Sequence, residues 1–371
     1  MASKELLLGD EALAQGALDA GLSGVYAYPG TPSTEITEYI QGHPLTAQRG
    51  IHSAWSANEK TAVEEALGMS FAGKRSMVCM KHVGMNVAAD AFVNSAMTGA
   101  NGGMIVVAAD DPSMHSSQNE QDSRFYGKFA LVPIFEPSSQ QEAYDMAADA
   151  FEMSERHRIP VLLRLTTRMA HSRAVVETGE RRAENPLAYP ENTRQWVLMP
   201  GNSRVRYKTL IEEYKQFEAE AAGSRYNRYT DGADKSMGII ACGIAYNYLM
   251  ENFPDGCPYP VLKVSQYPLP TALVRRMASE CRSILVIEEG QPMVEETVRG
   301  VLPTPIEIKG RLSGELPRTG ELTPDCVREA VGLPAHPAHA ASEVTVPRPP
   351  ALCQGCGHRD MYKTLTDVVH E

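Results

Sequence analysis

Several short segments combine polar side chains at spacings that can support chemistry, and the first of them is Tyr28–Ser33. Here a predicted strand passes through Gly30 into a predicted helix, with Thr31 as its N-cap and Pro32 as its first residue. Helix N-termini attract anions such as carboxylates. A plain capped turn has the same residues, so both interpretations stay open. The sequence contains no G-x-x-x-x-G-K-[ST] motif, which excludes a phosphate loop of that type.

A second candidate is Glu59, which follows Asn58 at the start of an alanine-rich helical segment ending near Ala72. An acidic residue in a first helical turn usually only complements the helix dipole. A buried glutamate that shares a proton with a ligand nitrogen is a different case, because burial raises its pKa and holds the proton in place. Glu65 lies on another face of the same helix, so the pattern does not indicate a pair of catalytic carboxylates.

Two polar segments, Lys81–Asn86 and His115–Arg124, each follow a predicted strand. Open α/β sheets bind ligands at the carboxyl ends of their strands, so both segments are candidates for a binding site. A run of polar residues such as the second is more often a solvated loop. The pairs Asp110-Asp111 and Glu288-Glu289 also end strands, and either Mg²⁺ binding or simple solvation is compatible with them.

The last candidate is Cys353-Gln-Gly-Cys356, followed by His358. A C-x-x-C turn presents two thiolates to one metal ion or iron–sulfur cluster, although four ligands are normally needed. No second C-x-x-C exists here, so the other ligands come from elsewhere or these thiols bind no metal. A redox dithiol is disfavoured because no thioredoxin-type pattern surrounds the pair. The remaining cysteines are isolated, which indicates reduced thiols and a cytoplasmic protein.

The elements that must position these residues alternate between apolar strands and helices over most of the 371 residues. This order predicts parallel sheets covered on both faces. The strands expected in the first half are 25–28, 76–80, 103–109 and 159–165, and the helices are 10–20, 56–72, 86–98 and 139–154. The second half adds strands at 238–241, 260–264 and 283–287, with helices at 246–252, 271–280, 293–300 and from 360 onward.

Residues 170–235 break this rhythm and predict an extended connector that wraps other structure. The domains expected are therefore 1–175, a connector 176–235, a second α/β domain 236–332, a Pro- and Ala-rich linker 333–350, and the start of a further domain at 351–371. The net charge of −11 disfavours a nucleic-acid partner, and no apolar run is long enough to cross a membrane.

Together these segments resemble the α subunits of indolepyruvate:ferredoxin oxidoreductases, within the thiamine diphosphate-dependent 2-oxoacid:ferredoxin oxidoreductase superfamily. The resemblance covers essentially the whole chain. It is carried by Leu7–Ala12, Tyr28–Ser33, Trp55–Lys60, Met80–Asp90, Asp110–Arg124, Tyr267–Pro270, Glu288–Gly290, Gly314–Leu322 and Arg348–Cys353. It implies an α/β fold in which a thiamine diphosphate-binding, pyrimidine-type parallel-sheet domain precedes a transketolase C-terminal-like α/β domain.

The resemblance also implies roles for individual residues. Glu59 is expected to hydrogen-bond the aminopyrimidine of thiamine diphosphate and to act as the catalytic carboxylate, with Pro29, Gly30, His82 and Asn86 as further cofactor-binding residues. Thr31, His82, His115, Gln121 and Arg124 are expected to bind the 2-oxoacid, and Cys353 and Cys356 to ligate an iron–sulfur cluster. The implied reaction decarboxylates an aryl-2-oxoacid oxidatively, passes electrons to ferredoxin and transfers the acyl group to coenzyme A.

Family members continue beyond the C-x-x-C into a diphosphate-binding domain that holds Mg²⁺, and usually into a domain with [4Fe-4S] clusters. This chain is therefore expected to be part of a longer polypeptide or a split subunit, and to need a second subunit or domain in an oligomer. The alternatives are another 2-oxoacid as substrate (pyruvate, branched-chain or phenylglyoxylate-like), a non-oxidative decarboxylase, and a non-catalytic assembly subunit.

Overall fold

The computed structural model describes residues 3–190, 193–302, 305–337, 340, 342–346, 352 and 355–370. It separates into two units, Met1–Pro334 and Ala335–Glu371. Within the described residues, no helix combines the length and the apolar character needed to cross a bilayer.

The first unit is built around a seven-stranded sheet with the order β12-β6-β7-β5-β4-β2-β3. All neighbouring strands are parallel except β12, which pairs antiparallel with β6. The strands are β2 (Gly24–Ala27), β3 (His52–Trp55), β4 (Ser76–Lys81), β5 (Met104–Asp110), β6 (Ile134–Phe135), β7 (Val161–Thr166) and β12 (Gln266–Tyr267). The predicted parallel sheet is confirmed, and the apolar runs that predicted β4, β5 and β7 are its buried centre.

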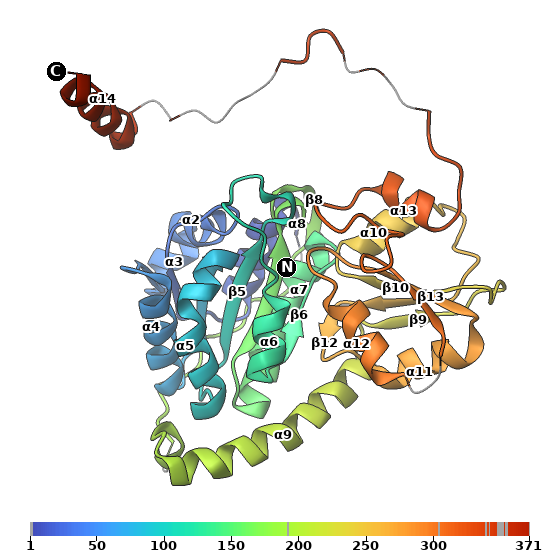
Figure 1. The fold of residues 1–371 in the computed structure, drawn as a ribbon. Helices are drawn as coiled ribbons and strands as arrows, with labels where there is room; N and C mark the ends of the chain where they lie inside the picture. Colours follow the sequence, from blue (N-terminus) through green and yellow to red (C-terminus); the bar gives the residue numbers. More distant parts are fainter. Residues whose placement is uncertain are drawn as a thin grey trace. The chain divides into compact units, whose positions relative to one another are not determined.

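Helices cover both faces of this sheet (Figure 1). Helices α1 (Gly9–Asp19) and α7 (Gln140–His157) pack together on one face, while α4 (Glu59–Phe71), α5 (His82–Thr98) and α6 (Arg124–Ala130) cover the other. The predicted start of α7 is confirmed, since the Ser139 hydroxyl caps the helix by accepting the Glu142 N–H at 3.2 Å. Shorter elements complete the region: β1 (Lys4–Leu8), which pairs with β8 (Arg173–Glu177), α2 (Thr34–Gly42), α3 (Pro44–Arg49), η1 (Pro112–Met114) and α8 (Thr167–His171).

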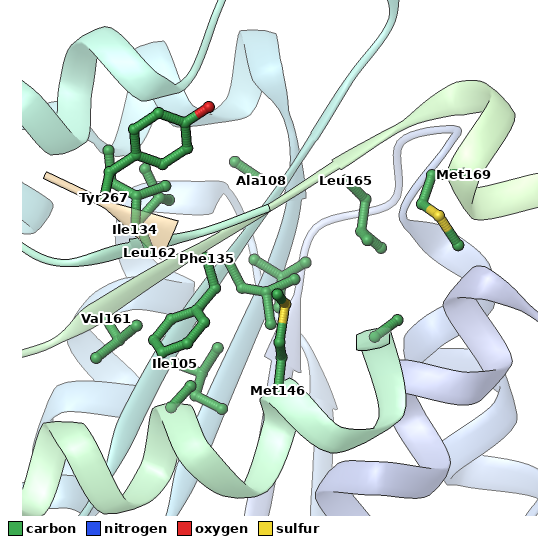
Figure 2. Close-up of a cluster of buried hydrophobic side chains, with 14 of the residues drawn as sticks. Ile105, Ala108, Ile134, Phe135, Met146, Val161, Leu162, Leu165, Met169 and Tyr267 are labelled. Carbon is green, nitrogen blue, oxygen red and sulfur yellow. The ribbon is translucent and has the colours of Figure 1, made fainter. Parts of the chain in front are cut away.

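Figure 2 shows the apolar core between the sheet and α7. Ile105, Phe135 and Val161, from three adjacent strands, lie on the same side of the sheet as Met146 of α7, and each is almost completely buried. Tyr267 of β12 lies at the margin of this cluster with its hydroxyl directed away from the apolar side chains. The core therefore extends to β12, a strand of the same sheet that comes much later in the sequence.

A second, five-stranded sheet has the order β14-β13-β10-β11-β9 and confirms the predicted second α/β region. Its strands are β9 (Arg228–Thr230), β10 (Gly238–Cys242), β11 (Val261–Val264), β13 (Ser283–Ile287) and β14 (Glu307–Lys309), parallel except for β9. Helices α10 (Ala245–Met250), α11 (Thr271–Glu280), α12 (Met293–Val301) and α13 (Pro324–Ala330) accompany it.

The expectation of an extended connector over residues 170–235 is wrong for its central part. After the short turn η2 (Arg194–Trp196), residues Pro200–Ala222 form α9, a helix of 23 residues that contacts both α5 and α11 (Figure 1). Only Leu210, Phe217 and Ala221 of α9 are buried, so its apolar positions are too sparse to show a helical period in the sequence.

The second unit contains α14 (Gly357–His370), which confirms the helix predicted from residue 360 and begins three residues earlier than expected. Much of the predicted linker, including 347–350, lies outside the described residues, and so does Cys353.

Candidate functional site

The direction of strand addition in the larger sheet reverses between β2 and β4. The chain passes from β2 to β3 on one side and then returns to place β4, β5 and β7 on the other side. In open parallel sheets, ligands bind at the carboxyl ends of the strands at such a reversal. The segments Tyr28–Ser33 and Lys81–Asn86, which were candidates from the sequence, follow directly after these two strands.

The turn after β2 is held by internal hydrogen bonds. The Gly30 N–H donates to the Thr34 hydroxyl at 2.9 Å, and the Ser33 hydroxyl donates to the Gly30 carbonyl at 2.8 Å. Pro29 and Thr31 are exposed and Gly30 is half-buried. The prediction that Thr31 caps a helix is wrong: α2 begins at Thr34, and the peptide bond between Thr31 and Pro32 is cis. The Thr31 side chain thus lies on the turn, ahead of the helix.

Glu59 is the first residue of α4, a helix capped by the Asn58 side chain, which accepts the Thr61 N–H at 3.0 Å. Its carboxylate lies against the first turn of α5, because a Cβ built on Gly84 would come 2.5 Å from Glu59 Oε1. Glycine at position 84 is what allows this approach. The Glu59 side chain is half-buried, and among the described residues its carboxylate has no hydrogen-bond partner.

His82 begins α5 and is completely buried. Its Nε2 lies 3.0 Å from the Asn119 carbonyl oxygen, which can only accept, so Nε2 carries the hydrogen. The second ring nitrogen, Nδ1, is buried and has no partner in the described part of the chain. An imidazole held by one nitrogen with the other unpaired can serve a ligand, since buried polar atoms are otherwise almost always satisfied.

Lys81, at the end of β4, secures the loop that follows β5. Its ammonium donates to the Ser116 carbonyl at 2.8 Å and lies 4.0 Å from Asp111. Burial lowers the pKa of Lys81, and Asp111 partly opposes that shift. Burial also disfavours the ionised form of Asp111. Hydrogen bonds from Ser117, Ser116 and Thr167 outweigh that effect and hold its pKa below the ordinary value. The loop is thereby fixed next to the turn after β2.

The other predicted residues occupy different surroundings. Asn86 is exposed and accepts the Tyr126 hydroxyl at 3.2 Å. His115 is exposed too, with Nε2 lying 3.4 Å from Glu321 of the second sheet region. Gln121 donates to Asn119 at 3.3 Å, while its side-chain oxygen is buried without a partner among the described residues. His82 and Gln121 therefore both contact Asn119, whereas Asn86 and His115 lie outside that contact.

Arg124 does not lie in an open site. It is completely buried, and all three of its guanidinium nitrogens are engaged. Its partners include Asp122 at 2.5 Å, Glu288 at 3.0 Å and the Glu289 carbonyl at 2.9 Å. The prediction that Arg124 binds the substrate carboxylate does not agree with this placement, because no donor is left for a ligand.

Arg124 belongs to a cluster of buried charges between the two sheets, here called the intersheet cluster: Asp110, Asp122, Arg124, Glu136, Arg164, Glu288, Glu289 and Arg311. Burial raises the pKa of Glu288 to about 7 against the opposing effect of Arg124. Burial also raises the pKa of Glu289 to about 7, although the nearby Arg311 guanidinium lowers it. The pairs Asp110-Asp111 and Glu288-Glu289, left open by the sequence, are thus not solvated. Three of these carboxylates join the cluster and Asp111 holds the loop.

The cysteine candidates lie in the second unit. Cys356 Sγ is 3.3 Å from His358 Nδ1, and Cys353 is outside the described residues. Neither the need for glycine at position 84 nor the link between Lys81 and Asp111 was predicted from the sequence. Gly84 does carry a signal, since a glycine inside a helical pattern often marks a close approach. The partner of Lys81 comes from a distant loop and leaves no local signal.

Residues 15–237, more than half of the chain, match the family described as pyruvate flavodoxin/ferredoxin oxidoreductase, thiamine diphosphate-binding. The chain belongs to this family. Among curated proteins it is 42% identical to the indolepyruvate oxidoreductase subunit IorA of Methanothermobacter marburgensis, over 98% of the chain and 60% of that relative. The chain thus spans about 60% of the length of this curated relative.

Two solved structures share the α/β fold of this family member. The 2-oxoglutarate:ferredoxin oxidoreductase from Magnetococcus marinus, with 2-oxoglutarate, coenzyme A and succinyl-CoA bound, superposes with a TM-score of 0.71 at 16% identity. The match covers 88% of this chain and 64% of that one. A split gene transketolase, an inactive β4 tetramer, gives a TM-score of 0.54 at 16% identity over 88% of this chain and 97% of its own. These likenesses confirm the predicted fold class.

Proposed function

We propose that this chain contributes the pyrimidine-binding half of the site in a thiamine diphosphate-dependent 2-oxoacid:ferredoxin oxidoreductase that acts on aryl-2-oxoacids of the indolepyruvate type. Residues 1–175 are the proposed pyrimidine-binding domain, 176–235 the connector and 236–332 the transketolase C-terminal-like domain. The observation that carries the proposal is Glu59 at the carboxyl edge of the sheet, a half-buried carboxylate for which the described residues offer no hydrogen-bond partner. An aminopyrimidine nitrogen is a partner that such a carboxylate can bind.

The residues around Glu59 support this assignment. When bound, thiamine diphosphate supplies the carbon nucleophile that attacks the 2-oxo carbon of the substrate, so that CO2 can leave. Glu59 would hold a proton between its carboxylate and a ring nitrogen of the pyrimidine. His82 is oriented through Asn119 and keeps Nδ1 for a ligand, with Pro29, Gly30 and Asn86 around the cofactor.

The substrate is assigned to the same edge. Thr31, on the turn after β2, is proposed to bind the 2-oxoacid carboxylate, and Gln121 and His115 to line the approach from the loop after β5. The internal hydrogen bonds of the turn and the link between Lys81 and Ser116 keep these segments in place without the ligand. A site built in advance in this way lowers the cost of orienting the substrate.

The rest of the reaction is proposed to require a further polypeptide segment or subunit. That part would hold the diphosphate with Mg²⁺, the [4Fe-4S] clusters and the sites for coenzyme A and ferredoxin. The 60% coverage of the curated relative supports this need. Residues 351–371 are the proposed start of the diphosphate-binding domain, and Cys353 and Cys356 are proposed ligands of a cluster.

The decisive test replaces Glu59 in the assembled enzyme. We expect Glu59→Gln to lower kcat by about 10²–10⁴-fold, the usual contribution of a positioned acid–base group, while thermal unfolding stays unchanged. Glu64→Gln is the matched control, because Glu64 lies on the same helix, is 57% exposed and pairs only loosely with Lys60 at 3.9 Å. Equal activity of the two variants would refute the role of Glu59 and favour a non-catalytic assembly subunit.

The substrate assignment is tested separately with the same complex. Indolepyruvate and phenylpyruvate are expected to be turned over faster than pyruvate, a branched-chain 2-oxoacid or phenylglyoxylate, with reduction of ferredoxin. Turnover of pyruvate without aryl pyruvates would overturn the aryl assignment but leave the thiamine chemistry intact. Aldehyde as the sole product would instead identify a non-oxidative decarboxylase.

A further inference from the structure

Three side chains that could bind a metal ion converge at the edge of the larger sheet where β2 and β7 end. Asp10 is the second residue of α1, Glu35 the second residue of α2, and His171 the last residue of α8. One carboxylate oxygen of each acid and one ring nitrogen of the histidine all lie within 4.8 Å of one another. Helix α1 contacts both α2 and α8, so packing of the three helices sets this arrangement.

The carboxylates in this group lack partners. Asp10 is completely buried, and neither of its oxygens has a hydrogen-bond partner among the described residues. Glu35 Oε2 is buried and unpaired as well, while its Oε1 lies 3.5 Å from His171 Nε2. Unpaired buried carboxylates cost several kcal/mol in general unless a cation or a proton neutralises them.

We propose that Asp10, Glu35 and His171 bind a divalent cation of the Mn²⁺ and Zn²⁺ class. Imidazole favours first-row transition metals, and carboxylates favour Mn²⁺ among them. Ca²⁺ requires six or more oxygen ligands, and Mg²⁺ prefers oxygen ligands with several of its waters retained, so one imidazole and two carboxylates suit these ions less. Glu35 is half-buried and His171 exposed, so both side chains can rotate toward an ion placed on the fixed Asp10.

The ion would have a structural consequence for the edge of the sheet. It joins the first turns of α1 and α2 to the end of α8, across positions 10, 35 and 171. Helix α2 starts at Thr34, directly after the turn that carries Gly30 and Thr31. The cation would therefore fix the start of α2 and the turn before it, and it does so whether or not the function proposed above is right.

Mn²⁺ is the better probe, because cysteine thiolates in general prefer Zn²⁺ and the chain has seven cysteines. The full chain without thiamine diphosphate is titrated with Mn²⁺ and followed by electron paramagnetic resonance. We expect one tight Mn²⁺ per chain and a nitrogen-14 coupling from the imidazole. Asp10→Asn should weaken binding by at least about tenfold, since loss of even an outer-shell partner costs roughly 10–100-fold. His171→Gln should remove the nitrogen coupling.

The matched control is His157→Asn, because His157 pairs with Glu220 at 2.7 Å but belongs to no group of three converging ligand atoms among the described residues. This variant should bind Mn²⁺ like the parent. Non-saturable binding, or equal binding by the parent and the His171→Gln variant, would overturn the proposal and indicate that Asp10 and Glu35 share a proton instead. Because His171 is exposed, that comparison holds even if Asp10→Asn does not fold.

Discussion

Two regions of this molecule differ in whether their polar side chains have partners within the protein. In the intersheet cluster, every arginine is matched: Arg124 binds Asp122 and Glu288, and Arg164 binds Asp110 at 2.5 Å. At the carboxyl edge of the larger sheet, Glu59 and the Nδ1 atom of His82 have no partner in the described part of the chain. Paired buried charge holds structure together, whereas polar groups left without a protein partner at the edge of a sheet persist where a ligand completes them.

The largest expected effect comes from breaking the satisfied region. Arg124→Met should lower the free energy of unfolding by about 3–5 kcal/mol, because it removes the nearest cation from buried Asp122 and buried Glu288. Denaturant titration measures this loss. The control is Arg276→Met, since Arg276 pairs with Glu280 at the surface, where solvent screens the pair, and the substitution should leave the free energy of unfolding nearly unchanged. Similar losses in both variants would mean that the buried ion pairs of the intersheet cluster stabilise the protein no more than a surface ion pair does.

A smaller effect is expected from adding a side chain next to Glu59 at the carboxyl edge of the larger sheet. Gly84→Ala places a methyl group against the Glu59 carboxylate, so Glu59 must move. We expect activity of the assembled enzyme to fall about 10–100-fold, the range typical of a misplacement near 1 Å, with little change in stability. Gly68→Ala is the control, because its Cβ would meet nothing within 4 Å and alanine favours a helix. Unchanged activity in Gly84→Ala would separate Glu59 from the reaction.

The smallest expected effect is the pH dependence of the free energy of unfolding that Glu288 causes in the intersheet cluster. Glu288 has a pKa of about 7 when folded, against 4.5 as its ordinary value. The folded protein therefore binds a proton more tightly than the unfolded chain, and stability falls as pH rises from about 4.5 to about 7. Glu288→Gln removes this term, so the variant should gain on the order of 2 kcal/mol relative to the parent across that window. Denaturation at the two pH values measures the difference, and a constant difference would contradict the raised pKa.

The sequence predicted most of the fold but only part of the site. Continuous apolar runs are sufficient to place buried strands such as β4 and β5, and Ser139 marks the start of α7. Helix α9 was not predictable in this way, because only three of its 23 residues are buried and the apolar residues show no helical period. The start of α2 was misplaced because a turn with a cis peptide bond occupies the residues that would otherwise cap and begin the helix.

Residue types alone could not separate the two regions. Arg124 and Glu59 both follow strands of the larger sheet, and both were chemically reasonable site residues. Arg124 is satisfied by Glu288 and Glu289, which come from the second sheet and lie far away in the sequence. Glu59 is left free because Gly84 makes room for it without offering a donor. These differences depend on long-range packing, which local patterns do not encode.

Helix α9 has a mechanical consequence. Its 23 residues correspond to a rod of about 35 Å that rests on α5 at one sheet and on α11 at the other. A continuous helix resists bending far more than a loop of equal length, and the intersheet cluster adds a second attachment elsewhere. The two sheets are therefore joined at two separate places, and we expect them to move together as one body.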